Sequence, residues 1–112
     1  MALIQYIVVR CDLNWPLGAL IAQGCHASVA ALTKFKEHDF TKSYLQDLEN
    51  MHKVVLKADE AQLTEIVTKL TNNNIDFYLW KEMPENITSA LATRPYYKQD
   101  IHPFLKHLKL YS

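Results

Sequence analysis

One stretch near the start of the chain, residues 5–32, constrains the fold more than any other. It opens with Gln-Tyr-Ile-Val-Val-Arg-Cys-Asp-Leu, a short apolar and β-branched run that is typical of a strand buried on both faces. Breaker residues follow, with Asn14 as a candidate N-cap and Pro16 suited to a first helical turn. The apolar residues after Pro16 recur every 3.6 positions, which predicts a helix.

This predicted helix has two faces of different character. We expect the apolar face to pack on the sheet, and its residues are Leu17, Ile21, Cys25, Val29 and Leu32. The second face carries one amide, Gln23, and one imidazole, His26. Ligands of open α/β sheets bind outside the carboxyl ends of the strands, where Arg10, Cys11 and Asp12 would emerge. The strand, turn and helix together therefore make a scaffold for a site.

The rest of the chain alternates between helical and strand patterns. Asp59 with Gln62 forms a capping-box pattern at the start of one helix. The predicted elements are helices over 41–50, 60–72 and 100–110, strands over 52–58, 76–81 and 87–93, and a turn at 83–86. This order predicts an α/β fold of three layers, α/β/α, around a mixed four-stranded sheet. Three strands should be parallel, and the fourth antiparallel because its connection is too short for a crossover.

Composition bounds the class of protein. A chain of 112 residues with 49% apolar and 21% charged residues is expected to form one folded domain over 1–112. The zero net charge argues against a protein that coats nucleic acid non-specifically. The sequence shows neither a signal peptide nor a run of roughly 20 apolar residues, so we expect a cytoplasmic protein without a membrane partner.

The cysteines and histidines do not suggest a metal or a cofactor. Cys11 and Cys25 are interpreted as reduced thiols packed in the core. The histidines and cysteines lack the paired short spacings of zinc sites, and two glycines cannot form a phosphate-binding loop. Nucleophilic catalysis by Cys25 with His26 is not expected, because adjacent helix residues point in different directions.

Four motifs spread over nearly the whole chain carry a family resemblance. They are Arg10-x-Asp12-Leu13, Trp15-Pro16-x-Gly18-Ala19-Leu20-x-Ala22-Gln23-x-x-His26-Ala27, Pro84-Glu85-Asn86-Ile87 and Arg94-Pro95-Tyr96. The sequence resembles the class II (archaeal and eukaryotic) peptidyl-tRNA hydrolases, and most closely their peptidyl-tRNA hydrolase domain-containing branch. The resemblance implies a mixed four-stranded sheet between helices. It also implies hydrolysis, without a metal, of the ester that joins a peptide to the terminal ribose of tRNA.

The resemblance further suggests partners. The substrate would be peptidyl-tRNA, held at the acceptor end of the tRNA. Members of this family often form dimers, so a homodimer is one expectation. If the chain is a binding module instead of an enzyme, a ubiquitin-like protein or another protein is a further possible partner.

Two departures from the family pattern affect the expected site. Gly18 is kept, but the position of the family lysine that is regarded as catalytic holds Ala19. The family's Asp-Ala-Gly-x-Thr segment corresponds to the altered region 81–89. In this region Glu82 most nearly takes the aspartate position and Ser89 that of a second threonine, whereas the first threonine has no clear counterpart.

Ester hydrolysis needs a positioned water, a base and donors for the developing oxyanion. Glu82 or Glu85 could activate the water, Gln23 or Ser89 could serve the oxyanion, and His26 could do either. The expected catalytic residues are therefore Gln23, His26, Glu82 and Ser89, with Asp12 and Gly18 as substrate contacts. The structural alternatives are a hydrogen-bonding His26, solvated carboxylates, an ordinary strand serine, and an ion pair between Asp12 and Arg10.

A charge asymmetry suggests where tRNA could bind. Residues 94–112 carry a net charge of +3, whereas residues 37–65 carry −4, as if one face were turned toward phosphate. The basic residues of the first segment are Arg94, Lys98, Lys106 and Lys109. Tyr96 and Tyr97 could stack on unpaired terminal bases. The alternatives are solvated lysines and tyrosines that cover the core.

Three functions follow from these residues. We favour a peptidyl-tRNA or aminoacyl-tRNA ester hydrolase, slowed by the missing lysine, which would cost on the order of 2–4 kcal/mol if that lysine stabilises the transition state. The alternative is a catalytically inactive member that binds tRNA or a protein. A third possibility is hydrolysis of another ester or amide.

Overall fold

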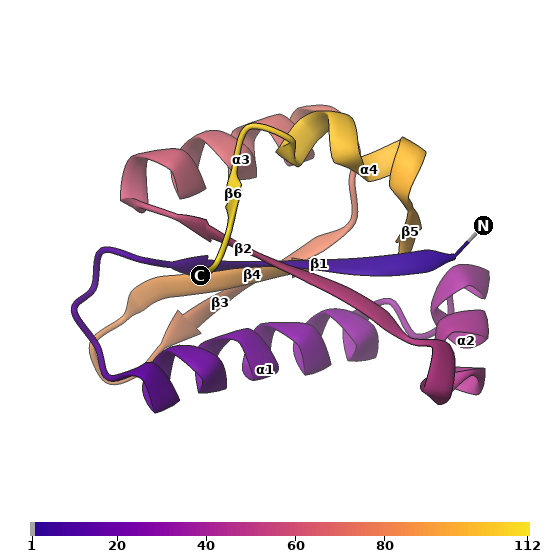
Figure 1. The fold of residues 1–112 in the computed structure, drawn as a ribbon, viewed down its shortest axis with the longest axis horizontal. Helices are drawn as coiled ribbons and strands as arrows, with labels where there is room; N and C mark the ends of the chain where they lie inside the picture. Colours follow the sequence, from indigo (N-terminus) through magenta and orange to yellow (C-terminus); the bar gives the residue numbers. More distant parts are fainter. Residues whose placement is uncertain (1) are drawn as a thin grey trace.

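A mixed β-sheet lies between two layers of helices (Figure 1). The structure is a computed structural model and describes residues 2–112. The strands are β1 (Leu3–Arg10), β2 (His52–Ala58), β3 (Phe77–Glu82), β4 (Ile87–Thr93), β5 (Tyr96–Tyr97) and β6 (Lys109–Leu110). The helices are α1 (Leu17–Lys34), α2 (Asp39–Gln46), α3 (Glu60–Asn72) and α4 (Lys98–Leu105), with a 3₁₀ turn at Leu48–Asn50.

The sheet has the order β3-β4-β1-β2-β6, and β5 pairs with β1 beside this row. β1 and β2 are parallel, and β4 runs antiparallel to both β1 and β3. β1, β2 and β3 therefore run in one direction and β4 in the other, as predicted. The predicted number of four strands was wrong, because β5 and β6 extend the sheet to six.

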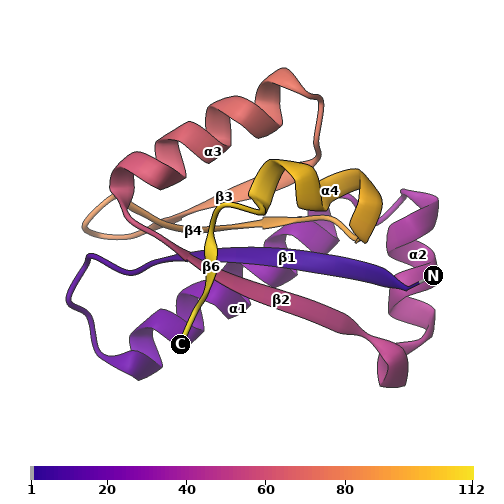
Figure 2. The same cartoon turned by 45° about the horizontal axis from the view of Figure 1, so that its top comes forward.

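The core is divided by the sheet into two parts. On one face α3 and α4 lie side by side (Figure 2) and bury large aliphatic side chains, among them Val8, Leu56, Ile66, Leu91 and Ile101. On the other face α1 packs through small residues, and the cluster there consists of Ile7, Val9, Ala27, Ala31, Ala90 and Ala92. β1 is therefore buried on both faces, as its sequence predicted.

The apolar face of α1 was wrongly assigned from the sequence. Leu17 and Val29, expected to pack on the sheet, are 69% and 64% exposed, and Ile21 is also exposed. The buried residues of α1 are Gln23, Gly24, Ala27, Ser28 and Ala31. Small side chains let the helix approach the sheet closely: a Cβ added to Gly24 would lie 3.4 Å from Cγ2 of Val9. The larger residues are consequently left outside.

The prediction that both cysteines are packed in the core was also wrong. Cys11 and Cys25 are free, as expected, but both are exposed and neither belongs to the core. Cys11 follows the end of β1, and Cys25 lies on the outward face of α1.

Several element boundaries differ from the predictions. Pro16 is the N-cap of α1, whereas Asn14, the expected cap, has a positive φ of 62°. The helix predicted over 41–50 begins earlier, at Asp39, and ends at Gln46. The last helix stops at Leu105 rather than at residue 110, because the chain turns there and Leu110 pairs with Leu56 at the edge of β2.

Other predictions were confirmed. β2 and β4 have the predicted bounds, and Asp59 and Gln62 form the reciprocal capping box of α3. Within residues 2–112, no helix combines the length and the apolar character that crossing a bilayer requires. The cytoplasmic location stays a prediction.

The orientation of α1 yields a prediction about stability. Val29→Ser should change the free energy of unfolding by less than about 0.5 kcal/mol, since Val29 is exposed. Ala31→Leu should cost about 1–3 kcal/mol, because Ala31 is fully buried against the sheet. Urea denaturation measures both, and equal losses would contradict the observed orientation of α1.

Candidate active site

A β-bulge at the β3–β4 hairpin organises the candidate site. Trp80 pairs with Ala90 and the next residue, Lys81, pairs with Thr88, so Ser89 is an extra residue in β4. Bulges re-aim side chains, often next to functional sites. Here the hydroxyl of the fully buried Ser89 donates to Oε1 of Gln23 at 2.5 Å, and this bond joins β4 to α1.

The Gln23 amide is buried and oriented. Gln23 is only 2% exposed, and its side-chain carbonyl oxygen accepts a hydrogen bond from the Ser89 hydroxyl. The amide NH₂ is therefore the end of Gln23 that can donate to another group. A donor fixed in this way can meet a carbonyl oxygen or an oxyanion without reorganising.

His26 lies one helical turn after Gln23 and stacks on Trp80 of β3. The two ring centroids are 4.7 Å apart and the ring planes are inclined by 20°. The indole N–H of Trp80 donates to Oε1 of Glu82 at 3.1 Å. The four predicted catalytic residues thus lie on α1, β3 and β4. Ser89 contacts Gln23 directly, whereas His26 and Glu82 are linked through Trp80.

Trp80 itself was missed by the sequence analysis. Side chains two residues apart in a strand point to the same face, so Trp80 and Glu82 share a face of β3. That spacing was a usable signal. It was overlooked because Trp80 was interpreted only as part of an apolar strand.

Asp12 and Arg10 form the ion pair that was one of the alternatives. Nε of Arg10 lies 2.6 Å from Oδ1 of Asp12, and Nη1 donates to the carbonyl of Thr88 at 3.0 Å. Asp12 also accepts the backbone N–H of Glu60 at 3.1 Å. The hydrogen bonds from Arg10 hold the pKa of Asp12 below its usual value. This pair therefore ties together the end of β1, the start of α3 and the bulged strand.

The predicted basic face is only partly available to a ligand. Arg94 is buried, with Nε 2.8 Å from Oδ2 of Asp76 and its guanidinium over the ring of Tyr96. Tyr96 is buried and accepts the N–H of Asp76, and Tyr97 packs edge-on against Phe40. The expectation that Arg94 and Tyr96 face tRNA is therefore corrected, because each is committed to contacts within the protein.

The remaining predicted contacts are exposed. Lys98 and Lys106 lie on and just after α4, across the sheet from α1 (Figure 2), and Lys109 lies in β6. Glu85 is exposed in the turn after β3. Gly18 lies in the first turn of α1, and nothing lies within 4 Å of where its Cβ would be.

A groove adjoins the stacked rings. Its volume is about 550 Å³, and its lining consists of Cys25, His26, Val29, Ala30, Thr33, Lys34, Tyr78 and Trp80. We call it the aromatic groove. The ammonium of Lys34 lies 5.7 Å from the centroid of the Tyr78 ring. β3 is at one edge of the sheet, and no other strand within residues 2–112 pairs with its outer side.

Among residues 2–112, no group of three or more histidine, cysteine, aspartate or glutamate side chains is arranged to hold a metal ion. The candidate site therefore consists of an amide, a hydroxyl, an imidazole, an indole and a carboxylate. Such a set can orient a water molecule, accept its proton and donate to an oxyanion.

Comparison with known proteins gives consistent relatives. The family model described as "Peptidyl-tRNA hydrolase PTH2" matches residues 3–111. The chain is 48% identical over 116 residues to the human protein named "Putative peptidyl-tRNA hydrolase PTRHD1", covering 98% of this chain and 83% of that one. It is 29% identical over 112 residues to the "Peptidyl-tRNA hydrolase" of Methanothermobacter thermautotrophicus, covering 95% of this chain and 97% of that one.

The Asp12 ion pair predicts a change in acid stability. A carboxyl whose pKa is lowered by folding stabilises the native state above its unfolded pKa, and this contribution is lost as the pH falls through the lowered value. We expect Asp12→Asn to be less stable than the wild type at pH 7 and to lose less stability between about pH 5 and pH 2. Urea denaturation across this range measures both effects, and parallel pH profiles would contradict the prediction.

Proposed function

The chain belongs to the peptidyl-tRNA hydrolase PTH2 family, and from this premise we propose that it hydrolyses the ester between a peptidyl or aminoacyl group and the terminal ribose of tRNA. The observation that carries the proposal is the buried hydrogen bond from Ser89 to Gln23 beside the His26–Trp80 stack. Water attacks the ester carbonyl, and the products are a carboxylic acid and a free ribose hydroxyl.

In this proposal the buried amide serves the carbonyl oxygen of the ester. Gln23 donates its N–H to the oxygen as negative charge develops there, and Ser89 keeps the amide in the donating orientation. Both groups are buried and paired before substrate arrives. The site therefore needs little reorganisation during the reaction.

His26 acts as the general base in the proposed reaction. Its imidazole takes a proton from the attacking water and returns that proton to the departing ribose oxygen. Glu82 is a positioning residue, because its carboxylate accepts the indole N–H of Trp80 and so fixes the ring on which His26 stacks.

The aromatic groove supports a place for the unpaired acceptor end. Bases of single strands stack on aromatic side chains beside a cationic path for the phosphates. Tyr78 and Trp80 offer such rings and Lys34 the cation.

The other proposed contacts lie outside the aromatic groove. Gly18 leaves open space for substrate at the start of α1, and Lys98, Lys106 and Lys109 stay proposed contacts for more distant parts of the tRNA. A homodimer and a protein partner also stay predictions.

A second candidate function is supported by one residue. Ala19 occupies the position of the family lysine, so the site has one cation fewer than the family pattern. If that lysine stabilises the transition state, its loss would cost on the order of 2–4 kcal/mol. A protein with this deficit could retain the fold for binding tRNA or a protein without turning over the ester.

The first test is release of a labelled N-blocked amino acid from its tRNA at high enzyme concentration. We expect Gln23→Ala to lower kcat on the order of 10²–10³-fold, because an oxyanion donor is lost. Gln99→Ala is the matched control, since it removes an exposed amide from α4. No release above buffer by the wild type would reject the hydrolase.

The second test restores the missing cation. Ala19→Lys should raise kcat on the order of 10²–10³-fold if a lysine at this position stabilises the transition state. The same release assay measures kcat of this variant. Lys34→Met tests substrate binding in the aromatic groove, and it should raise KM rather than lower kcat. An inactive wild type that becomes active through Ala19→Lys would favour the binding function for the natural chain.

A further inference from the structure

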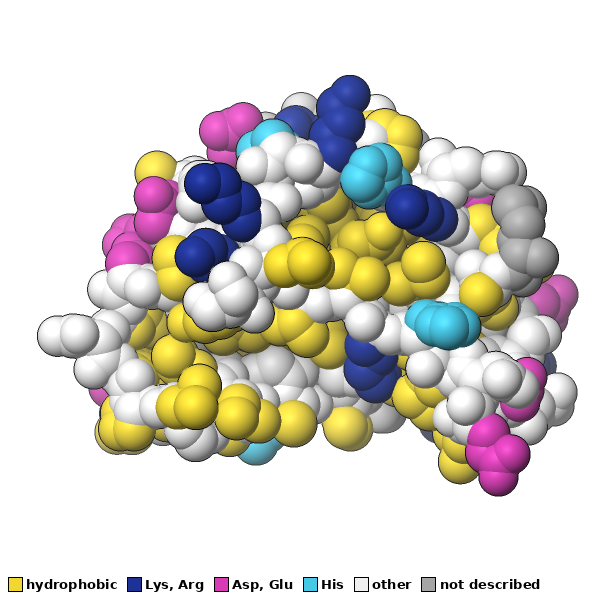
Figure 3. All heavy atoms as spheres, viewed as in Figure 1, with side chains coloured by type: hydrophobic (Ala, Val, Ile, Leu, Met, Phe, Trp, Pro, Cys, Tyr) yellow, Lys and Arg dark blue, Asp and Glu magenta, His cyan; other side chains and the backbone are white. Residues whose placement is uncertain are grey.

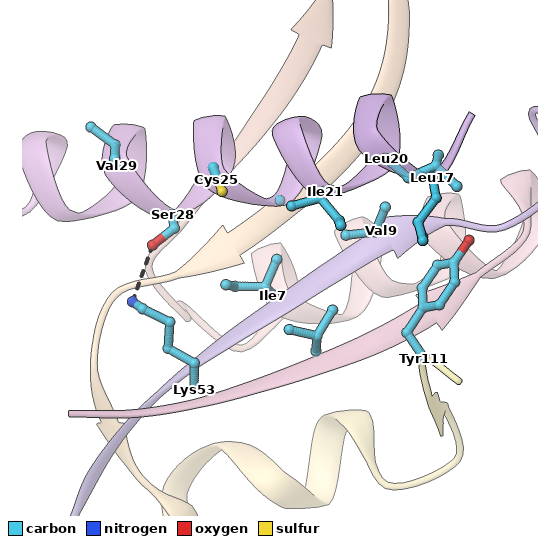
Figure 4. A pocket seen from close by; sticks show the side chains of 12 residues that line it. Ile7, Val9, Leu17, Leu20, Ile21, Cys25, Ser28, Val29, Lys53 and Tyr111 are labelled. Atoms are coloured by element: carbon cyan, nitrogen blue, oxygen red, sulfur yellow. Dashed lines mark hydrogen bonds between the residues drawn. The ribbon is translucent and has the colours of Figure 1, made fainter. Parts of the chain in front are cut away.

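A second groove lies between α1 and the sheet, where β2 is left uncovered. Hydrophobic side chains gather across the middle of this face (Figure 3). The groove has a volume of about 490 Å³, within the range of small-molecule sites. Its lining includes the exposed stripe of α1, with Leu17, Ile21 and Val29, and residues of β1 and β2 (Figure 4). We call it the lysine groove.

Lys53 is the single charged residue among those that line this groove. Its ammonium lies at one end, close to Ser28, whereas Leu17 and Tyr111 lie at the other end (Figure 4). The ammonium donates to Oε1 of Gln5 at 2.6 Å and to Oγ of Ser28 at 3.2 Å. Both acceptors are neutral, so neither compensates the positive charge.

The acceptors of Lys53 are held rigidly. Gln5 is fully buried, and its Nε2 donates to the carbonyls of Ser28 and Thr93 at 3.1 Å each. The Ser28 hydroxyl donates to Oε1 of Gln5 at 2.7 Å. Since Nε2 of Gln5 makes both of its hydrogen bonds, Oε1 of Gln5 is fixed toward the groove. It holds the Lys53 ammonium at one end of the groove.

This arrangement leaves the ammonium suited to an anion. An ammonium has three protons. Two of them are directed to Gln5 and Ser28, and Nζ also lies 5.3 Å from the centroid of the Tyr44 ring. Partial burial lowers the pKa of Lys53, the direction expected when a charged group loses part of its hydration. The Tyr44 ring is neutral, so a carboxylate would supply both a stronger acceptor for the third proton and the opposite charge.

We propose that the lysine groove binds an unbranched apolar carboxylate of the fatty-acid class, with its carboxylate on Lys53 and its chain along Ile21 and Val9 toward Tyr111. Between Val29 and Leu17, α1 rises roughly 18 Å. A saturated chain of twelve carbons, extended at about 1.2 Å per bond, is roughly 14 Å long and fits within that span.

A small ligand accounts for this groove better than a protein does. The single charged group stands at one end of a mainly apolar channel, whereas a protein interface has an apolar centre surrounded by a polar rim. Gln23 and His26 do not take part, so the inference goes beyond the proposed hydrolase and does not depend on it. Cys25 and Val29 form the ridge between this groove and the aromatic groove.

Calorimetric titration of the full chain with dodecanoate below its micelle concentration tests the proposal. We expect saturable binding of one molecule per chain, and roughly 10–100-fold weaker binding of dodecanamide, which lacks the charge. Lys53→Met should weaken dodecanoate binding by the same factor. Lys36→Met, which removes an exposed lysine just after α1, should leave it unchanged.

A substitution in the apolar wall gives an independent check. Ile21→Asp places a charge in the path of the chain at a position that is 59% exposed, so the fold should persist by circular dichroism while dodecanoate binding is lost. Equal affinity for dodecanoate and dodecanamide, unchanged affinity of Lys53→Met, or the absence of saturable binding would each overturn the proposal. A dimer that Ile21→Asp dissociates, without fatty-acid binding, would overturn it in favour of a second copy.

Discussion

The close approach of α1 to the sheet determines both the candidate site and the exposed apolar face of this helix. Small residues on both sides of that contact, such as Ala27 and Ala90, permit the approach. The short separation lets the Gln23 amide reach the Ser89 hydroxyl of β4. It also forces the larger residues of α1, Leu17 and Val29, to face outward. The buried Gln23–Ser89 pair and the apolar wall of the lysine groove therefore both result from the close packing of α1 on the sheet.

The sequence predicted well those features that depend on local signals. The capping box at Asp59 and the bounds of β2 and β4 follow from residues within a few positions of each other. Strand directions followed from connection lengths. The buried face of α1 could not be predicted in the same way. Periodicity favours the largest apolar residues as core, but here the alanines of a distant strand, β4, decide which face fits.

Residues of the candidate site were predictable to the extent that a motif held them together. Gln23 and His26 lie within one motif, whereas Trp80 emerges only from the stacking of β3 against α1. Charge counting misjudged Arg94 for a related reason. Its partner, Asp76, lies 18 positions earlier in the chain and meets it only after the sheet has formed. Two-residue strands such as β5 are too short to show any period.

In the proposed hydrolase the position of the family lysine holds Ala19, so the charge of the transition state would be stabilised mainly by fixed dipoles. Fixed dipoles stabilise a transition state only when they are already oriented, which makes the rigidity of the bulge decisive. Arg10 supplies part of that rigidity, because it donates to the carbonyl of Thr88, the residue before Ser89, while Asp12 holds its guanidinium. Ser89 in turn orients the Gln23 amide on the face of the sheet that α1 covers, opposite Arg10. The Arg10–Asp12 pair thus belongs to the architecture of the candidate site even though it lies behind it.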